Sequence, residues 1–193
     1  MISDRMEKPL ASWRGKERYE NELLECLTLI LKSGGCSWSA CRMCSYRHER
    51  YKAESCDALL AYLKAQLAWV MNEYNSEEYR MIKIFTSGSF FDPREVPPGF
   101  LADIASAFRG KLLIAETRPE FVRQEVLAKF IETLDDGSWK TPLYCAIGLE
   151  TSNDVIREKC INKGFTFQDF QNAAQRARTV GAGVKAYLLF KPL

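Results

Sequence analysis

The chain has 193 residues, of which 47% are hydrophobic and 27% are charged. Such a composition predicts one globular domain, or two small ones, with a buried core, and it excludes a disordered or low-complexity chain. With 27 basic against 25 acidic residues, the formal net charge is +2. This balance excludes a strongly basic or acidic protein as a whole, although it leaves room for a local basic patch.

Neither a membrane span nor a secretory signal is visible in the sequence. No run of about 18 uncharged apolar residues occurs, and the N-terminal residues, MISDRMEKPLASWRGKERYE, lack an apolar segment. We therefore expect a cytoplasmic protein without membrane contact. Because the cytoplasm is reducing, the seven cysteines are not expected to form a disulfide framework. Four scattered cysteines are expected to pack as small hydrophobic side chains: Cys26, Cys56, Cys145 and Cys160.

The predicted elements alternate between strand and helix after a polar N-terminal segment. Residues 1–20 are mixed in charge and predict an arm or a short helix, followed by one domain over residues 21–193. Apolar runs bounded by turn residues predict strands at 26–33, 81–88, 111–117, 143–151 and 184–191. Apolar residues at helical spacing, prolines in first turns and a capping box at Thr166 and Asp169 predict the helices. These helices are expected at 55–74, 97–108, 119–134, 152–160 and 166–180.

This alternation predicts an α/β fold with parallel strands. Two architectures compete, an open doubly wound sheet and a (β/α) barrel or partial barrel. No GxGxxG motif follows the first strand, which disfavours a dinucleotide-binding fold. The sequence stops just after the last predicted strand, so we expect a domain truncated before its final strand–helix units.

Three cysteines follow the first predicted strand, and the carboxyl ends of parallel strands meet at one site. Cys36, Cys41 and Cys44 stand close together on the loop GGCSWSACRMCSYRHER. Three thiolates can hold an iron–sulfur cluster that keeps one iron open. A structural zinc needs four ligands, so that alternative adds His48, the only histidine of the chain. Unligated buried cysteines are the third alternative, disfavoured because polar residues separate the three.

A cysteine triplet on the loop after the first strand of a β/α chain resembles the radical S-adenosylmethionine (SAM) superfamily. The usual superfamily spacing is three then two intervening residues, whereas here it is four then two. The residue before the last cysteine is typically aromatic, whereas here it is Met43, with Trp38 and Tyr46 nearby as substitutes. Over residues 10–193 the chain resembles the archaeosine biosynthesis radical SAM family (RaSEA) and, more distantly, the radical domain of the Elongator catalytic subunit. The motifs that carry this resemblance are TSGSFFDPREVP, ETRPEF, GLETSNDVIREKCINKGFTFQDF and KAYLLFKP.

The resemblance implies a partial (β/α) barrel of radical SAM type. It also implies a [4Fe–4S] cluster held by Cys36, Cys41 and Cys44, with S-adenosyl-L-methionine bound to the open iron. One electron, from an electron donor, then cleaves SAM to methionine and a 5′-deoxyadenosyl radical, which abstracts a substrate hydrogen. The candidate cofactor-binding residues are Met43, Tyr46, Ser87, Gly88, Ser89, Glu116, Glu150 and Arg157.

Each of these candidates has a structural alternative. Residues 87–89 match the position at which the superfamily binds the methionine amino group, and the alternative is a plain strand-to-loop turn. Glu116 and Glu150 are expected to accept hydrogen bonds from the ribose or the amino group, and the alternative is a salt bridge at the mouth of the barrel, for which Arg118 is one candidate partner. Arg157 is expected to pair with the methionine carboxylate, and the alternative is a solvated helix face.

The cysteine motif continues into a basic stretch in which aromatic residues are interleaved. This pattern suits the edge of a nucleic-acid site, and an ordinary solvated loop is the alternative. The residues are Arg42, Tyr46, Arg47, His48, Arg50, Tyr51 and Lys52.

By resemblance, the chain acts in tRNA modification. It would form archaeosine from a lysine-bearing deazaguanine nucleotide by radical C–N cleavage, together with the partner transferase that attaches the lysine. One alternative is a radical SAM enzyme of the same branch with another substrate. The other is a zinc-containing RNA-binding protein without catalysis, in which three cysteines and His48 hold the metal.

Overall fold

The computed structural model describes residues 6–190, and its strands form one six-stranded sheet in the order β1-β2-β3-β4-β5-β6. The first pair, β1 and β2, is antiparallel, and every later pair is parallel. The strands are β1 (Ala11–Tyr19), β2 (Glu22–Ile30), β3 (Met81–Phe85), β4 (Leu112–Glu116), β5 (Leu143–Glu150) and β6 (Gly183–Leu188). The predicted parallel α/β fold is therefore confirmed.

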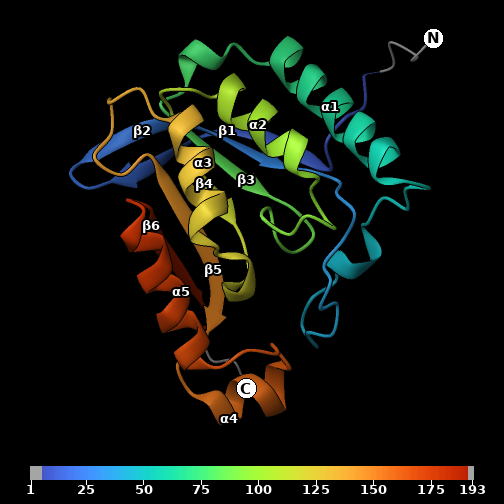
Figure 1. Ribbon diagram of the computed structural model, residues 1–193, viewed down its shortest axis with the longest axis vertical. Coiled ribbons are helices and arrows are strands. Elements are labelled where there is room, and N and C mark those ends of the chain that lie inside the picture. The colour runs from blue at the N-terminus through green and yellow to red at the C-terminus, as the bar shows by residue number, and fades with distance from the viewer. Residues whose placement is uncertain (1–5, 191–193) are drawn as a thin grey trace.

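Helices connect the parallel strands and cover one face of the sheet (Figure 1). The α-helices are α1 (Cys56–Glu73), α2 (Pro98–Ala107), α3 (Gln124–Leu134), α4 (Asp154–Ile156) and α5 (Phe167–Thr179). The short turns are η1 (Tyr46–His48), η2 (Ser76–Glu78), η3 (Pro119–Phe121) and the π-helix η4 (Arg157–Ile161). None of the helices in residues 6–190 combines the length and apolarity needed to cross a bilayer.

The first strand corrects the sequence prediction, because residues 11–19 form β1 rather than an arm or a short helix. β1 is an edge strand that pairs only with β2, so charged side chains at alternate positions remain in solvent and no apolar run marks it. The predicted arm therefore belongs to the sheet from residue 11, while its residues 1–5 lie outside the described part of the chain.

The helix predicted from Pro119 also begins later. The segment first makes the turn η3, and α3 starts at Gln124. Arg176 of α5 explains the delay, because its guanidinium donates to the carbonyl oxygens of Val122 at 2.7 Å and Pro119 at 2.8 Å. Those carbonyls are thereby engaged by α5. The predicted capping box of α5 is confirmed, with Thr166 and Asp169 bonding each other's backbone N–H.

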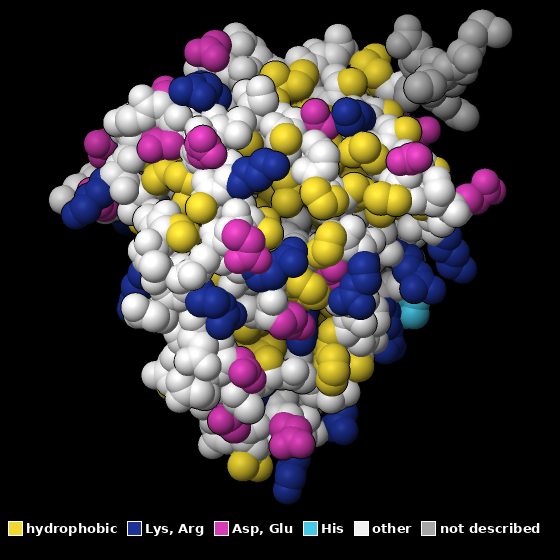
Figure 2. Space-filling model, viewed as in Figure 1, with side chains coloured by type: hydrophobic (Ala, Val, Ile, Leu, Met, Phe, Trp, Pro, Cys, Tyr) yellow, Lys and Arg dark blue, Asp and Glu magenta, His cyan; other side chains and the backbone are white. Residues whose placement is uncertain are grey.

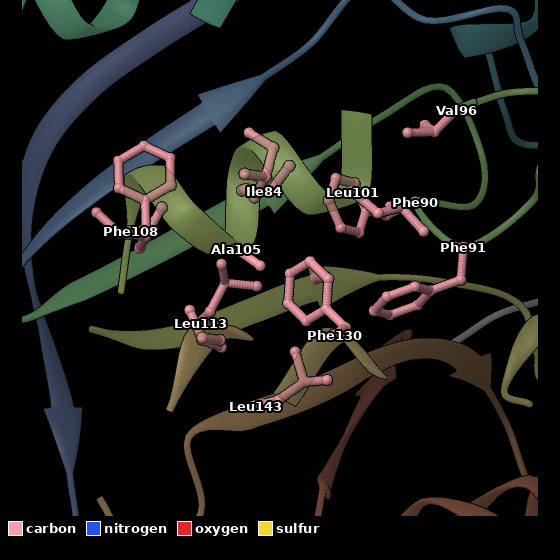
Figure 3. Close-up of a cluster of buried hydrophobic side chains, with 14 of the residues drawn as sticks. Ile84, Phe90, Phe91, Val96, Leu101, Ala105, Phe108, Leu113, Phe130 and Leu143 are labelled. Atoms are coloured by element: carbon pink, nitrogen blue, oxygen red, sulfur yellow. The ribbon is translucent and has the colours of Figure 1, made fainter. Parts of the chain in front are cut away.

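The main core lies between the sheet and its covering helices. Phe90 and Phe91 follow β3 and meet Phe130 of α3, with ring centroids 5.8 and 5.6 Å from the third ring and near-perpendicular planes (Figure 3). Leu113 of β4 and Leu143 of β5 lie beneath them, and both are fully buried.

The scattered cysteines only partly follow the prediction. Cys26 and Cys145 are buried among hydrophobic side chains, as expected. Cys56 and Cys160 are exposed, so the expectation that they pack in the core is wrong. Both exposed cysteines lie on helices at positions that face solvent, α1 for Cys56 and η4 for Cys160.

The sheet curls so far that its two edge strands touch through side chains on the uncovered face. Glu17 of β1 accepts from Lys83 of β3 at 2.9 Å and from Lys185 of β6 at 3.4 Å. The hydroxyls of Tyr19 and Tyr144 lie 3.3 Å apart, which joins β1 to β5. Such contacts need a strongly curved sheet, as in a partial barrel.

Candidate functional site

A cavity of about 250 Å³ opens where the parallel strands end. Ile30 at the end of β2 is paired with Phe85 at the end of β3, so the loops that follow leave the sheet side by side. Glu116 and Glu150 are the last residues of β4 and β5. The end of the fifth predicted strand, Lys191, lies outside the described residues.

Most of the predicted site residues line this cavity. They are Cys36, Cys41, Cys44, Met43, Tyr46, Ser87, Gly88, Glu116 and Glu150. Sequence reasoning did not assign four other lining residues to the site: Ser45, Thr86, Arg118 and Lys163. Arg118 was expected only as a structural ion-pair partner, and Lys163 was given no role although it lies in the motif GLETSNDVIREKCINKGFTFQDF.

The three thiols of the cysteine loop (residues 36–44) share this cavity and a smaller one beside it. Cys41 is buried, and burial raises the pKa of its thiol, although Lys163 and Arg118 act in the opposite direction. Among residues 6–190, no group of three or more His, Cys, Asp or Glu side chains has the geometry of a formed metal site. The three thiols therefore line the same cavity, but they are not arranged as the ligands of one metal ion.

Two further observations fit a cofactor in this space. The hydroxyl of Ser87 is buried and has no hydrogen-bond partner among the described residues, although Ser87 lines the cavity. At Gly88 a Cβ atom would lie 2.7 Å from the Cys36 sulfur, so only glycine leaves room for that thiol. The three thiols could hold an iron–sulfur cluster in which one iron has no protein ligand. The unpaired hydroxyl of Ser87 and the accessible backbone at Gly88 could bind a ligand that bears an amino group.

The structure does not bring His48 to the thiols. His48 is exposed on η1, and its Nε2 accepts a hydrogen bond from Arg47 Nε at 3.1 Å. It lines neither of the cavities that contain the cysteines. The zinc alternative therefore lacks its fourth ligand in this geometry.

Hydrogen bonds attach the cysteine loop to the C-terminal end of η4 and the residue that follows it. Trp38 Nε1 donates to the carbonyl of Asn162 at 2.8 Å, and Asn162 Nδ2 donates to the carbonyl of Ala40 at 2.9 Å. The Arg42 N–H donates to the last carbonyl of η4 at 2.9 Å. Trp38 also covers Gly164, where a Cβ atom would lie 2.3 Å from the indole ring. Trp38 therefore attaches the cysteine loop to the segment after η4 and does not line the cavity. The aromatic residue that lines the cavity is Tyr46.

The two strand-end carboxylates have different environments. Glu150 accepts from Lys163 Nζ at 2.7 Å, and its positive φ of 65° marks an irregularity at the end of β5. Glu116 accepts no side-chain hydrogen bond among the described residues, and burial raises its pKa to about 7, against the lowering effect of Lys163. The alternative of a salt bridge at the mouth of the barrel is observed for Glu150, with Lys163 as its partner instead of Arg118, which pairs with Glu120 at 2.6 Å.

Ser89 does not line the cavity. Its hydroxyl accepts from the Arg118 N–H at 3.1 Å, and its own N–H donates to the carboxylate of Glu95. Glu95 is fully buried, and Ser33 Oγ donates to it at 2.7 Å. Burial raises the pKa of Glu95, while the bonds from Ser33 and Ser89 lower it. Sequence reasoning missed this buried carboxylate, which ties the ends of β2 and β3 together.

Arg157 is also placed away from the cavity. Its side chain is 1% exposed, and its guanidinium donates to the carbonyl oxygens of Phe165 and Thr151. It therefore neither reaches the site nor forms a solvated helix face. Nothing in the local sequence distinguishes a buried arginine on a short helix from an exposed one.

Curated relatives match almost the whole of this chain in sequence. No family model matches the chain. Archaeosine synthase subunit beta of Methanosarcina acetivorans is 40% identical over 96% of this chain and 54% of that protein. Archaeosine synthase subunit beta of Thermococcus kodakarensis is 34% identical over 94% of this chain and 56% of that protein. The chain spans about half the length of these curated relatives.

The fold has a counterpart among solved structures. A queuine lyase from Clostridium spiroforme, bound to SAM and queuine, superposes with a TM-score of 0.54 over 92% of this chain and 81% of that chain. At 16% identity, this likeness concerns the fold alone. The expected α/β fold with mostly parallel strands is thus shared with a solved SAM-bound structure. By its sequence similarity, the chain is a homologue of the archaeosine synthase subunit beta proteins, matching about half of their length.

Proposed function

We propose that this chain is the SAM- and cluster-binding part of a radical SAM enzyme that modifies tRNA during archaeosine synthesis. The observation that carries the proposal is the meeting of three thiols with the ends of β3, β4 and β5 around one cavity. The names of the relatives support a role in archaeosine synthesis, and the SAM bound in the queuine lyase structure supports SAM as the cofactor.

The chain's own residues have distinct roles in this proposal. Cys36, Cys41 and Cys44 would hold a [4Fe–4S] cluster, which supplies one-electron reductive cleavage of SAM to methionine and a 5′-deoxyadenosyl radical. The open backbone at Gly88 and the unpaired hydroxyl of Ser87 would receive polar groups of the methionine moiety.

The carboxylates at the strand ends would bind the rest of the cofactor. Glu116 has a free carboxyl group in the cavity and would accept from the amino group or the ribose. Lys163 holds Glu150 at the end of β5, so Glu150 would act in a fixed orientation. Met43 and Tyr46 would pack near the adenine. Ser89 and Arg157 are left out of cofactor binding, because their polar groups are engaged elsewhere.

The substrate assignment follows from the relatives. The radical would cleave a C–N bond of a lysine-bearing deazaguanine nucleotide in tRNA and so form archaeosine. The relatives are named as beta subunits, which supports a partner, the transferase that attaches the lysine. An electron donor would complete the system, and such a reaction on tRNA would take place in the cytoplasm.

Cluster formation is the first test. Anaerobic reconstitution with iron and sulfide is expected to give a brown protein with about four irons per chain. Cys36→Ser, Cys41→Ser or Cys44→Ser should each abolish the visible band, whereas Cys56→Ser and Cys160→Ser, which are exposed elsewhere, should keep it. A colourless protein with one tight zinc that is lost in His48→Ala would contradict the proposal.

Substrate dependence is the second test. The reconstituted chain, with its partner subunit, reductant and SAM, should produce 5′-deoxyadenosine, and tRNA bearing the lysine-modified base should accelerate its formation. Product tRNA would be read by mass spectrometry as archaeosine. If the cluster forms but this tRNA has no effect, the enzyme class stands and the archaeosine assignment falls in favour of another substrate.

A further inference from the structure

A second cavity, of about 460 Å³, lies beside the cysteine loop. Arg50, Lys52 and Arg94 line it, together with residues at the start of α1. Gly34 lines this basic cavity, and Cys36, two residues further along, lines the thiol cavity. The two cavities therefore share the segment that leaves β2.

Two of the three cations that line the basic cavity have no ionic partner within residues 6–190. No carboxylate is among its lining residues. Arg50 and Lys52 are exposed, and neither forms an ion pair in the described part of the chain. The Arg94 side chain forms an ion pair with buried Asp92 at 3.3 Å but is 70% exposed, so its guanidinium can still contact an anion.

The backbone that carries these cations is anchored. The Tyr51 N–H donates to the carbonyl of Ser33 at 2.8 Å, and the Tyr51 ring stacks on Tyr62 of α1 with 3.8 Å between centroids and planes 6° apart. Arg50 and Lys52 therefore project from a segment tied both to the end of β2 and to α1. A preformed array of cations loses less entropy on binding an anion than a mobile loop does.

The basic cavity continues into a wider surface, here named the basic flank. Lys and Arg side chains gather around the single histidine on one side of the molecule (Figure 2). Tyr46 lies among them and is 42% exposed. The cations of the basic flank are Arg42, Arg47, Arg50, Lys52 and Arg94.

We propose that the basic flank binds the sugar–phosphate backbone of an RNA substrate, with one phosphate seated in the basic cavity. The choice of RNA rests on the proposed function. A row of exposed cations fits an extended polyanion better than a single small anion, and phosphate contacts position a nucleic acid without reading its sequence. Because the basic cavity shares its loop with the thiol cavity, an RNA held here brings a nucleotide to the strand ends.

The test measures binding of a fluorescent tRNA transcript by anisotropy over a series of salt concentrations. Arg50→Gln with Lys52→Gln should weaken binding, and adding Arg94→Gln should bring the loss to tenfold or more. The slope of log Kd against log salt should fall by about 1 for the double variant, since both side chains contact the one phosphate in the basic cavity and each lost phosphate contact removes roughly one unit. Lys129→Gln with Arg178→Gln, which removes the same charge from α3 and α5, should bind within twofold of the parent.

Circular dichroism and the urea midpoint of each variant establish that it is folded. The double variant keeps the contact between Arg94 and Asp92. If the triple variant is unstable, the affinity and salt slope of the double variant alone test the inference. Unchanged affinity and salt slope in the folded double variant would overturn the inference. So would equal competition by polyglutamate at matched charge, since the flank would then attract any polyanion.

The outcome separates this inference from the proposed function. If the parent forms its cluster and cleaves SAM but does not bind tRNA, the basic flank is not an RNA site and the enzyme class stands. If the parent binds tRNA through the flank but takes up no cluster, the surface stands and the radical chemistry is wrong.

Discussion

The absence of a Cβ atom at Gly88 leaves the space that the Cys36 side chain occupies. A Cβ atom here would overlap Cys36, lying 2.5 Å from its Cβ and 2.7 Å from its sulfur. Gly88→Ala should therefore displace the Cys36 thiol and reduce the iron content after reconstitution by at least half. Gly99→Ala on α2 is the matched control, since its new methyl group meets only Leu60 at 3.5 Å and should leave loading unchanged. Full iron content in Gly88→Ala would show that the loop adjusts freely.

Glu116 should make stability fall as pH rises. Burial raises its pKa from a usual value of 4.5 to about 7, so between these values the folded chain keeps a proton that the unfolded chain has lost. The free energy of unfolding should then decrease by about 2 kcal/mol from pH 5 to 7. Glu116→Gln should remove this decrease. Urea unfolding at pH 5, 6 and 7 measures it, and parallel curves for parent and variant would refute the assignment.

At the scale of elements, the contact between the cysteine loop and the end of η4 is the least expected feature. Asn162 is in the left-handed region, with φ of 58°, and joins Trp38 and Ala40 through its carbonyl and its amide. Asn162→Gly should cost about 1 kcal/mol through the lost hydrogen bond, and Asn162→Ala about 2, because alanine adds backbone strain. Hydrogen exchange of residues 37–43 should rise in both. Equal stability of the two variants would mean that the backbone conformation contributes nothing.

The elements that sequence patterns predicted well are those shaped by near neighbours. α1 was predicted from its apolar spacing and α5 from its capping box at Thr166, both of which are patterns within a few turns, and the structure adds a cap at Ser55. β1 and the start of α3 were missed for the opposite reason. β1 has no apolar run because its charged side chains at alternate positions remain in solvent. The turn before α3 is held by Arg176, which belongs to α5 and is distant in the sequence.

For the whole molecule, Glu17 is the group that links the two edges of the sheet. Burial alone would raise its pKa, but Lys83 and Lys185 together bring the pKa below its usual value. A carboxylate with a lowered pKa stabilises the fold above its unfolded value, and this contribution is lost as pH falls through the folded value. Glu17→Gln should therefore cost about 1–2 kcal/mol at pH 7, since Lys83 is left unpaired and largely buried.

The control for Glu17 lies on the same strand pair. Glu25 pairs with Lys16 at 2.9 Å, but both side chains are more than half exposed. Glu25→Gln should therefore change the free energy of unfolding by less than about 0.5 kcal/mol. Acid titration of both variants provides the comparison. Equal effects would mean that the Glu17 ion pairs contribute no more to the curled sheet than a surface pair does.

The sequence by itself determined the parallel α/β order, the three-cysteine loop after β2 and the convergence of strand ends, because periodicity and strand polarity are local properties. Only the tertiary structure decided which side chains face the cavity. It brought in Lys163 and Arg118, placed Ser89 and Arg157 in the supporting framework, and left His48 in solvent. These outcomes depend on contacts between residues far apart in the chain, such as Asn162 with Ala40, and no pattern of neighbouring residues encodes them.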